Sequence, residues 1–414
     1  MLRLPTENTL DKKGEIMAEW KNYTLEEVCE RIYSGGTPST KHEEYWNGDI
    51  KWLSSGETSQ RFVYDTERKI TQEGVENSST KLATKGCTVV ATAGQGYTRG
   101  QASFLMTDTY MNQSVIACKA NENVILPLYL YYNLDSRYEE FRLLSDGTST
   151  RGGLSGWILK RMEIKLPPKS SQKKIIDILY SIDRKIEENK AINNNLAEQS
   201  QAIFAEFMCK YPYVLSPLGD MAEIIDCLHS KKPKAVNGTT YQLLQLNNIT
   251  DSGFLDLSSK YYISKSDYEN WTRKCEIVEG DCVITNVGRI GAVSQAPNGT
   301  HAAMGRNMTC IRLRNDKPFY SYLITALLSP HIRREIMKNT DEGTIMGALN
   351  VKNIPLLLFP MFALPTMNAL EDLLSPIRKA IEQNYLSNQM LSLLRDSLLP
   401  RLMSGELDVS NIEI

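Results

Sequence analysis

Residues 171–207 read SQKKIIDILYSIDRKIEENKAINNNLAEQSQAIFAEF, and residues 366–402 read TMNALEDLLSPIRKAIEQNYLSNQMLSLLRDSLLPRL. The second stretch repeats the first at a constant offset of 195 residues, without a gap. The matched pairs are Ser171 and Thr366, Leu179 and Leu374, Ile182 and Ile377, Ile186 and Ile381, Asn189 and Asn384, Asn193 and Asn388, Leu196 and Leu391, and Ile203 and Leu398. A looser match extends upstream, where Gly86, Val90, Gly94, Asn112, Gly147 and Thr148 correspond to Gly280, Ile284, Gly288, Asn307, Gly343 and Thr344. The chain is therefore an internal duplication, and we expect it to offer two similar but different surfaces to a partner.

Both stretches predict long helices with a coiled-coil seam. The seam positions recur at alternating steps of four and three residues, which is the coiled-coil spacing. The helices are expected at 171–209, opened by Ser171, and at 366–399, opened by Thr366 and ended by Pro400 and Gly405. Each is roughly 50 to 57 Å long at about 1.5 Å per residue, which suits a spacer between two globular modules. The seam residues are Ile175, Leu179, Ile182, Ile186, Asn189, Asn193, Leu196, Ser200, Ile203 and Phe207 in the first helix, and Leu370, Leu374, Ile377, Ile381, Asn384, Asn388, Leu391, Arg395, Leu398 and Leu402 in the second.

The first seam is symmetric about position 191, and this symmetry predicts how the helices pair. Reflection about that point maps each seam position of the first helix onto another seam position. If the helices lie antiparallel, Asn189 faces Asn388 and Asn193 faces Asn384 at the midpoint. Buried amides that satisfy one another penalise every shifted register. The alternative is that these asparagines are exposed on a locally frayed helix.

The rest of the chain alternates short apolar runs with turn-rich stretches, which predicts mixed strands and helices. We therefore expect an α+β protein with two mixed α/β modules, joined by two long antiparallel coiled-coil helices and related by a pseudo-two-fold repeat. The predicted boundaries are 1–16 for an N-terminal extension, 17–169 for the first module, 170–210 for the first helix, 211–364 for the second module, and 365–414 for the second helix and a C-terminal tail.

Composition excludes several classes of protein. The 414 residues carry a formal net charge of -2, so we do not expect nucleic acid to bind over the whole surface. The sequence has no apolar run of membrane-spanning length, and its beginning lacks the apolar stretch of a signal peptide, so we expect a cytoplasmic protein. Its eight cysteines form no CxxC pair and no His lies at zinc-ligand spacing, so we expect reduced, mostly buried thiols and no metal site.

The sequence predicts neither a catalytic centre nor a bound cofactor. Residues 94–99, GQGYTR, have Arg99 where a dinucleotide-binding loop has its third glycine, so we interpret them as a turn. No GxxxxGK[ST] phosphate loop occurs, and residues 166–169, LPPK, lack the polar residue and the aromatic that flank the Pro-Pro of an amino-methyltransferase. We expect the four histidines at the surface or in caps, away from any nucleophile; they are His42, His229, His301 and His331.

Polar, glycine-rich loops follow short apolar strands in both copies. Arginine can bind guanine with two hydrogen bonds, Asn and Gln can bind adenine, and Ser, Thr and backbone amides bind phosphates. Such loops suit the reading of a DNA groove, although plain surface turns and solvated basic faces explain the same composition. The candidate DNA-binding residues from these loops and from local basic runs are Gln95, Tyr97, Arg99, Thr148, Arg151, Lys231, Lys232, Asn286, Arg289, Arg306 and Thr344.

Two segments resemble a known family. Residues 20–39, WKNYTLEEVCERIYSGGTPS, followed by 45–53, YWNGDIKWL, are similar to the opening of a target recognition domain in the specificity subunit of type I restriction-modification enzymes. Residues 398–409, LLPRLMSGELDV, resemble the C-terminal tail of that family. In the second copy, residues 227–234 replace the Gly-Gly-Thr-Pro-Ser turn, and the first helix lacks the tail. We therefore expect the two modules to recognise different sequences.

The resemblance implies a function. It adds Gly35, Gly36 and Thr37 of the glycine turn to the candidate DNA contacts. Each target recognition domain would read one half of a split, asymmetric site in double-stranded DNA, and the helix pair would set the gap and dock two modification subunits. Those subunits would supply S-adenosylmethionine chemistry, and restriction subunits would supply ATP-driven translocation and cleavage with Mg²⁺. The alternatives are a self-contained DNA-modifying enzyme with unrecognised motifs and a helical scaffold that bridges proteins.

Overall fold

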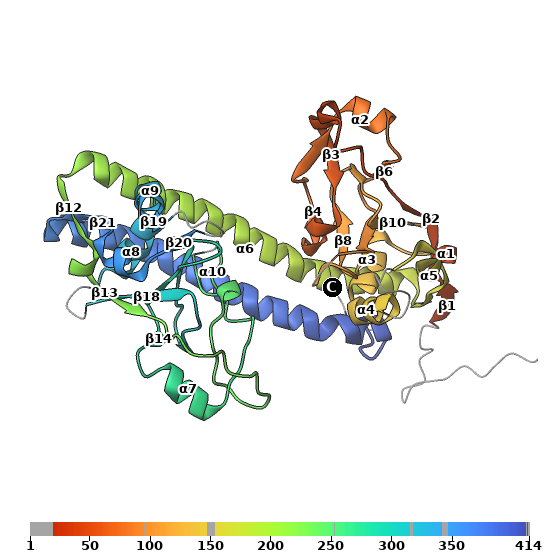
Figure 1. The fold of residues 1–414 in the computed structure, drawn as a ribbon. Helices are drawn as coiled ribbons and strands as arrows, with labels where there is room; N and C mark the ends of the chain where they lie inside the picture. The colour runs from red at the N-terminus through yellow and green to blue at the C-terminus, as the bar shows by residue number, and fades with distance from the viewer. Residues whose placement is uncertain are drawn as a thin grey trace, which may run out of the picture. The chain divides into compact units, whose positions relative to one another are not determined.

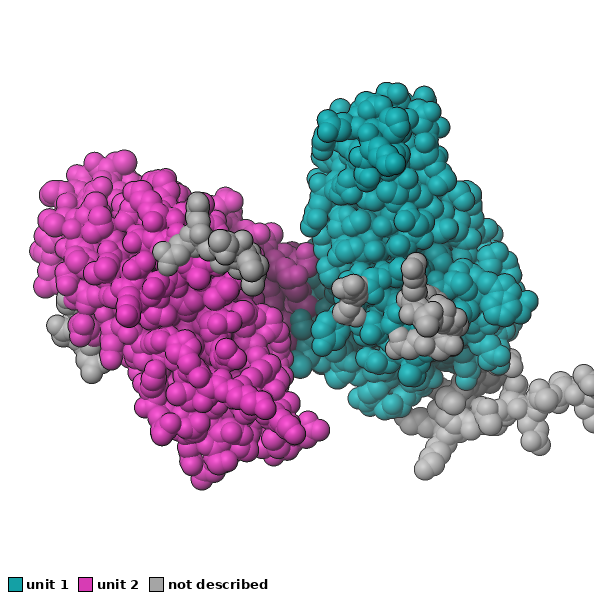
Figure 2. Space-filling view, in the orientation of Figure 1, with its two compact units in different colours: residues 1–184, 392–414 teal, residues 185–391 magenta. Residues whose placement is uncertain are grey.

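The protein is described from a computed structural model. The structure describes residues 20–94, 97–146, 154–251, 253–314, 318–341, 347–410 and 412. The chain forms two compact units, which Figure 2 shows in different colours. Unit 1 comprises residues 1–184 and 392–414, and unit 2 comprises residues 185–391. Across the described residues, none of the helices is both long and apolar enough to cross a bilayer.

Two long helices, α6 (Lys169–Lys210) and α10 (Leu364–Ser404), each belong partly to unit 1 and partly to unit 2 (Figure 1). Each begins two residues before its predicted cap, a difference within the usual fraying of helix ends. The prediction that Pro400 ends the second helix is wrong. Leu402 and Met403 are buried in the core of unit 1, and this packing outweighs the hydrogen bond that the proline removes. Gly405, with a φ of +80°, follows the last helical residue.

The predicted antiparallel pairing of the helices is confirmed within unit 2. Asn189 Nδ2 donates to Asn388 Oδ1 at 2.8 Å, and Asn384 Nδ2 donates to Asn193 Oδ1 at 2.9 Å. Since the partner number falls as the residue number rises, the two chains run in opposite directions. Two further bonds run from Asn193 Nδ2 to the Ile381 carbonyl at 3.1 Å and from Asn388 Nδ2 to the Ile186 carbonyl at 3.4 Å. Asn189 is 2% exposed, so a shifted register would leave a buried amide without its partner.

The central strands of the two units have the same order, which confirms the internal repeat. In unit 1 the main sheet runs β2-β10-β7-β8-β4, and in unit 2 it runs β13-β18-β15-β16. A two-stranded sheet at the entry of each module also recurs, as β1-β11 and β12-β21. Unit 1 carries an additional four-stranded sheet, β5-β3-β9-β6, whose apolar side is built on Trp46, Trp52 and Ile70.

The elements of unit 1 other than the long helices are β1 (Lys21–Thr24), α1 (Leu25–Val28), β2 (Cys29–Ser34), η1 (Glu43–Tyr45), β3 (Trp46–Leu53), η2 (Ser55–Ser59), β4 (Phe62–Val63), β5 (Arg68–Ile70), α2 (Gln72–Glu76), β6 (Lys81–Ala83), β7 (Thr88–Ala91), β8 (Ala102–Leu105), β9 (Thr109–Met111), β10 (Val115–Ala120), α3 (Pro127–Asp135), α4 (Tyr138–Asp146), α5 (Gly156–Arg161) and β11 (Glu163–Leu166). Those of unit 2 are β12 (Tyr213–Pro217), η3 (Leu218–Asp220), β13 (Ala222–Asp226), η4 (Leu246–Asn248), α7 (Lys265–Trp271), β14 (Glu276–Val278), β15 (Cys282–Thr285), β16 (Val293–Gln295), β17 (His301–Ala303), β18 (Met308–Leu313), α8 (Tyr320–Leu327), α9 (Pro330–Lys338), β19 (Thr340–Asp341), β20 (Ala348–Leu349), η5 (Val351–Leu356) and β21 (Leu358–Phe362).

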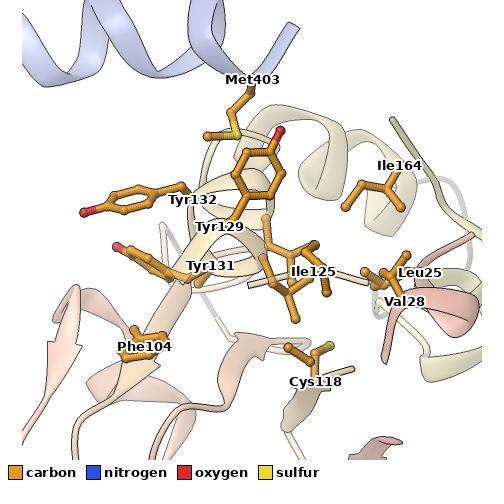
Figure 3. Close-up of a cluster of buried hydrophobic side chains, with 14 of the residues drawn as sticks. Leu25, Val28, Phe104, Cys118, Ile125, Tyr129, Tyr131, Tyr132, Ile164 and Met403 are labelled. Atoms are coloured by element: carbon orange, nitrogen blue, oxygen red, sulfur yellow. The ribbon is translucent and has the colours of Figure 1, made fainter. Parts of the chain in front are cut away.

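The core of unit 1 is continuous with the long helices. Helix α3 contributes three tyrosines that are 0% exposed, Tyr129, Tyr131 and Tyr132, and it packs between the sheet and α10. Figure 3 shows Met403 of α10 reaching toward these tyrosines, with Phe104 of the sheet below them. The module and the adjoining ends of the helices therefore share one hydrophobic core, so the module is not an independent domain attached to the helices.

Each long helix also caps a helix of its module, α6 capping α3 and α10 capping α8. Gln172 Oε1 of α6 accepts a hydrogen bond from the Leu126 amide, directly before α3, at 2.9 Å. The Glu371 carboxylate of α10 accepts from the amides of Ser321 and Tyr322, at the start of α8, at 3.1 and 2.8 Å. These amides have no partner within their own helix, so a side chain from outside satisfies them.

Candidate nucleic-acid interface

In unit 1, strand pairing brings the predicted polar loops to one end of the main sheet. The register pairs Ser34 of β2 with Ile116 of β10, and Ala91 of β7 with Val115 of β10. The segments that follow β2 and β7 therefore leave the sheet beside the segment that enters β10. We call this end the unit 1 corner, formed by residues 35–37, 97–99 and 112–114.

Unit 2 repeats the arrangement. Asp226 of β13 pairs with Thr309 of β18, and Thr285 of β15 pairs with Met308 of β18. The same three connections meet again, and we call this end the unit 2 corner, formed by residues 227–234, 286–291 and 304–307. The candidate residues from different parts of each copy are thus gathered by the topology of the sheet.

The unit 2 corner contains a groove with the chemistry of a nucleic-acid contact. Its volume is about 310 Å³, and its lining carries two cations, three amides and an indole but no carboxylate. Cations suit phosphates, amides suit base edges and an indole offers a stacking face. The lining residues are Lys232, Leu243, Gln245, Leu246, Asn247, Trp271, Arg306 and Asn307.

Local structure explains why the two cations face this groove. The Lys232 ammonium lies 3.9 Å from the centre of the Tyr261 ring, and the Tyr261 hydroxyl donates to the Pro233 carbonyl at 2.8 Å. Arg306 lies between Gly305, where a Cβ would come within 2.0 Å of the Leu244 carbonyl oxygen, and Asn307, which has a φ of +64°. This tight turn leaves Arg306 exposed. Lys231 is likewise exposed beside Lys232.

In the unit 1 corner, two of the candidate residues serve the fold. A Cβ on Gly35 would come within 1.9 Å of the Met111 carbonyl oxygen, and one on Gly36 within 2.1 Å of Ser79 Oγ. Both glycines are therefore required by close packing of the backbone. Thr37 is exposed, and its hydroxyl donates to Gln113 Oε1. Thr37 is the member of this turn that presents a polar side chain at the surface.

The loop after β7 presents a large aromatic side chain. Tyr97 is 83% exposed, and its carbonyl accepts a hydrogen bond from the Tyr138 hydroxyl of α4 at 3.0 Å. The backbone carbonyl of Tyr97 is thus held while its ring lies in solvent. Arg99, two residues later, is partly buried. An exposed ring on a held backbone suits contact with sugar or base surfaces.

Two candidates in the loop after β15 are already engaged by the protein. Asn286 is 6% exposed; its Nδ2 donates to the Leu349 carbonyl at 3.1 Å and its Oδ1 accepts from the Thr309 hydroxyl at 3.0 Å. The Asn286 amide thus joins β15, β18 and β20 in the interior, and little of this side chain is exposed. Arg289 pairs with Asp251, and its Nη1 donates to the Ile249 carbonyl at 3.0 Å. The Arg289 side chain is still 54% exposed, so it reaches solvent from within this pair.

Four of the predicted site residues lie outside the described residues: Gln95, Thr148, Arg151 and Thr344. Two residues that line the unit 2 groove were missed by sequence reasoning. Asn247 and Trp271 join the groove of unit 2 from segments that contain no glycine-rich loop. Their polar and aromatic character was visible, but their proximity to Lys232 depends on the path of the chain between strands.

Seven of the eight cysteines are buried, and Cys209 is exposed. His229 is exposed, and its Nδ1 lies 3.9 Å from Cys227 Sγ while its Nε2 lies 2.8 Å from Asp226 Oδ2. Burial raises the pKa of the Cys227 thiol, which keeps it protonated and poorly nucleophilic. The geometry therefore does not produce an activated cysteine.

A second group of potential metal ligands, Cys275, Asp281 and Cys310, is fully buried. Arg312 already occupies it, with Nη2 at 2.6 Å from Asp281 Oδ2 and at 3.6 Å from Cys275 Sγ. A metal ion here would face a guanidinium group at close range, which Coulomb repulsion disfavours. The arrangement suits a buried ion pair that joins β18 to the turn before β15.

Comparison with known proteins gives one family. A family model described as the type I restriction modification DNA specificity domain matches residues 17–198. The chain resembles the specificity subunit of type I restriction enzyme MjaIX from Methanocaldococcus jannaschii, with 24% identity over 96% of each chain. It also resembles the EcoR124I/EcoR124II specificity subunit from Escherichia coli, with 31% identity over 42% of each chain.

A solved structure agrees in fold. The crystal structure of the type I restriction-modification S subunit from M. genitalium has 14% sequence identity and a TM-score of 0.54, over 93% of this chain and 96% of that chain. The MjaIX relative and the M. genitalium structure each match this chain over more than nine-tenths of its length. Residues 17–198 therefore match the type I restriction modification DNA specificity domain, and the chain as a whole is similar in sequence and fold to type I restriction-modification specificity subunits.

Proposed function

We propose that each unit reads one half of a split, asymmetric DNA site through its corner. The observation that carries this proposal is the repetition of one corner on two sheets of the same strand order, with different side chains at equivalent places. Thr37 and Tyr97 would face one half-site, and Lys231, Lys232 and Arg306 the other. Different side chains on one scaffold explain how two modules read two different sequences.

Specificity subunits work within restriction-modification complexes, and we propose that the helix pair docks the partners. Apolar side chains that a coiled-coil seam does not bury support this role: on α10, Met390 is 71% exposed, Leu393 62% and Leu394 47%. Two modification subunits would bind along the helices and supply S-adenosylmethionine chemistry. Restriction subunits would supply ATP-driven translocation and Mg²⁺-dependent cleavage. This chain would supply the DNA address.

The test of the DNA contact is electrostatic. Lys231→Gln with Lys232→Gln should weaken binding of the assembled complex to all DNA sequences. Each lost phosphate contact should reduce the slope of log K against log salt by about one unit, so a decrease of about one to two is expected. Binding would be measured from about 50 to 200 mM salt on a duplex that carries the methylated motif and on an unrelated duplex.

The matched control is Lys265→Gln with Lys338→Gln. Both lysines are exposed in unit 2, and each pairs with a carboxylate of its own helix, Glu269 or Glu335. This control should leave the salt slope unchanged. If the Lys231 and Lys232 variant keeps the wild-type slope as well, these lysines do not contact phosphates and the unit 2 corner is not the DNA interface.

A further inference from the structure

Unit 1 contains a buried charged cluster at the place where its module meets the long helices. Its centre is Asp183 of α6, which is 2% exposed. Asp183 Oδ2 accepts a hydrogen bond from the Tyr132 hydroxyl of α3 at 2.8 Å, and Oδ1 accepts one from Arg395 Nη1 of α10 at 2.9 Å. Arg61 of the module adds an ion pair, with its Nε at 3.3 Å from Asp183 Oδ1. One carboxylate therefore joins the module to both helices.

Arg61 is itself held from a second side. Its Nη2 lies 2.9 Å from Asp135 Oδ2 at the end of α3, and its guanidinium lies 5.5 Å from the centre of the Tyr131 ring. Burial raises the pKa of Asp135, whose side chain is 18% exposed. Buried ion pairs tolerate few geometries, because a displaced charge loses its partner without regaining water.

In unit 2, a different residue connects the module to a long helix through polar contacts. Arg378 of α10 inserts into the module: its Nε donates to Gln295 Oε1 at 2.9 Å and its Nη2 to the Gly253 carbonyl at 2.6 Å. The guanidinium carbon lies 3.4 Å from the centre of the Phe254 ring. Gly253 makes room, since a Cβ there would be 3.3 Å from Arg378 Nη1 and the φ is +75°. Tyr385, farther along α10, stacks on the same Phe254 ring.

The two clusters stand at equivalent positions of the repeat. Asp183 and Arg378 are separated by 195 residues, the offset of the duplication, as are Ser200 and Arg395. The neighbouring seam pairs, Ile182 with Ile377 and Ile186 with Ile381, are identical. The duplication thus kept the apolar packing and replaced a carboxylate by a guanidinium at this point. Apolar contacts alone tolerate repacking, whereas directional polar contacts specify one orientation.

We infer that the Asp183 cluster and the Arg378 cluster are positioning devices that fix the orientation of each recognition module on the helix pair. The inference rests on the proposed reading of two half-sites. A module that can tilt on its helices reads its half-site at more than one distance from the other, so these residues hold the gap in the recognised sequence constant. They act through the module and do not touch DNA.

The experiment uses the complete complex with Asp183→Asn or Arg378→Met in this chain. Asp183→Asn keeps the shape of the side chain and leaves Arg61 beside Asp135 and Arg395 beside Asp396. Methylated DNA from cells that express each variant with its modification subunits would be sequenced. We expect unchanged half-site sequences, and methylation at sites one base pair longer or shorter should rise about tenfold relative to wild type, which corresponds to about 1.4 kcal/mol.

Matched controls lie beside each position. Asp177→Asn on α6 and Lys379→Met on α10 change exposed residues on the same helices and should leave the gap fixed. A folded, active Asp183→Asn or Arg378→Met variant that methylates sites of one gap length overturns the inference, and so does an altered half-site sequence. If either variant fails to fold by circular dichroism, Asp183→Glu and Arg378→Lys decide in the same way. Absence of a split motif for the wild-type chain would instead refute the proposed function.

Discussion

At the scale of single residues, the structure shows which candidate side chains already have partners within the protein. Arg289 pairs with Asp251, so its contact with a base requires this pair to open. If Arg289 reads a base, Arg289→Ala should cost about 1 to 3 kcal/mol of specific binding and relax one position of one half-site. Asp251→Asn should leave that position as selective as in wild type. The measurement is binding to a set of duplexes with single substitutions; an unchanged preference with reduced thermal stability would assign Arg289 to the fold.

Arg99→Ala is the parallel test in the other half-site.

Thiol reactivity tests burial at the same scale. Cys209 is the exposed cysteine, and the other seven are buried. One thiol of the native protein should therefore react rapidly with a disulfide reagent, and all eight should react in denaturant. Cys209→Ser should abolish the fast phase. Any fast-reacting thiol in that variant would show that a buried cysteine becomes accessible.

Burial of Cys282 predicts a pH dependence of stability. Burial raises the pKa of its thiol from 9.0 to about 12. Between these values the unfolded chain releases a proton that the folded chain keeps, so this contribution to stability is complete below pH 9 and is lost as pH rises. The loss is at most about 1.4 kcal/mol per pH unit. Cys282→Ala should decline less than wild type in urea unfolding between about pH 9 and 10.5; an equal decline in both proteins would contradict the prediction.

At the scale of elements, the asparagine pairs of α6 and α10 are expected to lower the stability of the helix pair and to fix its register. Replacing Asn193 and Asn384 with Leu should raise the unfolding temperature, because two partly buried amides become apolar contacts. The same variant should also allow shifted pairings and additional oligomers, measured by light scattering after gel filtration. Asn194→Leu, an exposed position on the same helix, is the control and should change neither quantity much. If the variant is more stable and still forms a single species, these amides do not determine the register of the helices.

At the scale of the whole molecule, the helix pair is predicted to set the gap between half-sites. One heptad adds about 10.5 Å of helix, or about three base pairs at roughly 3.4 Å each. Seven residues that preserve the seam, inserted near Leu196 in α6 and near Leu391 in α10, should lengthen the gap by that amount and leave both half-sites unchanged. The motif would be read by sequencing methylated DNA. An active variant with the wild-type gap would show that helix length does not set the spacing.

The duplication, the long helices and their antiparallel pairing were predictable from the sequence alone. Seam spacing depends on residues a few positions apart on one helix, and its symmetry carries the direction of pairing. Asn189 and Asn388 were predicted to face each other because both lie on regular helices whose geometry is known in advance. The resemblance to type I restriction-modification specificity subunits likewise depends on local sequence, the opening WKNYTLEEVCERIYSGGTPS and the tail LLPRLMSGELDV.

The corners and the module clusters were decided by the tertiary structure. Loop composition suggested Asn286 as a reader of bases, but pairing of β15 with β18 buries its amide. Lys232, Asn247 and Arg306 share a groove because the sheet returns distant segments to one end. In the sequence, nothing distinguishes Asp183 from an exposed helical carboxylate. Its burial and its role follow from its contacts with Tyr132, Arg61 and Arg395, which are distant in sequence. A local pattern determines a helix, whereas burial and the partners of a polar group depend on which surfaces the folded chain brings together.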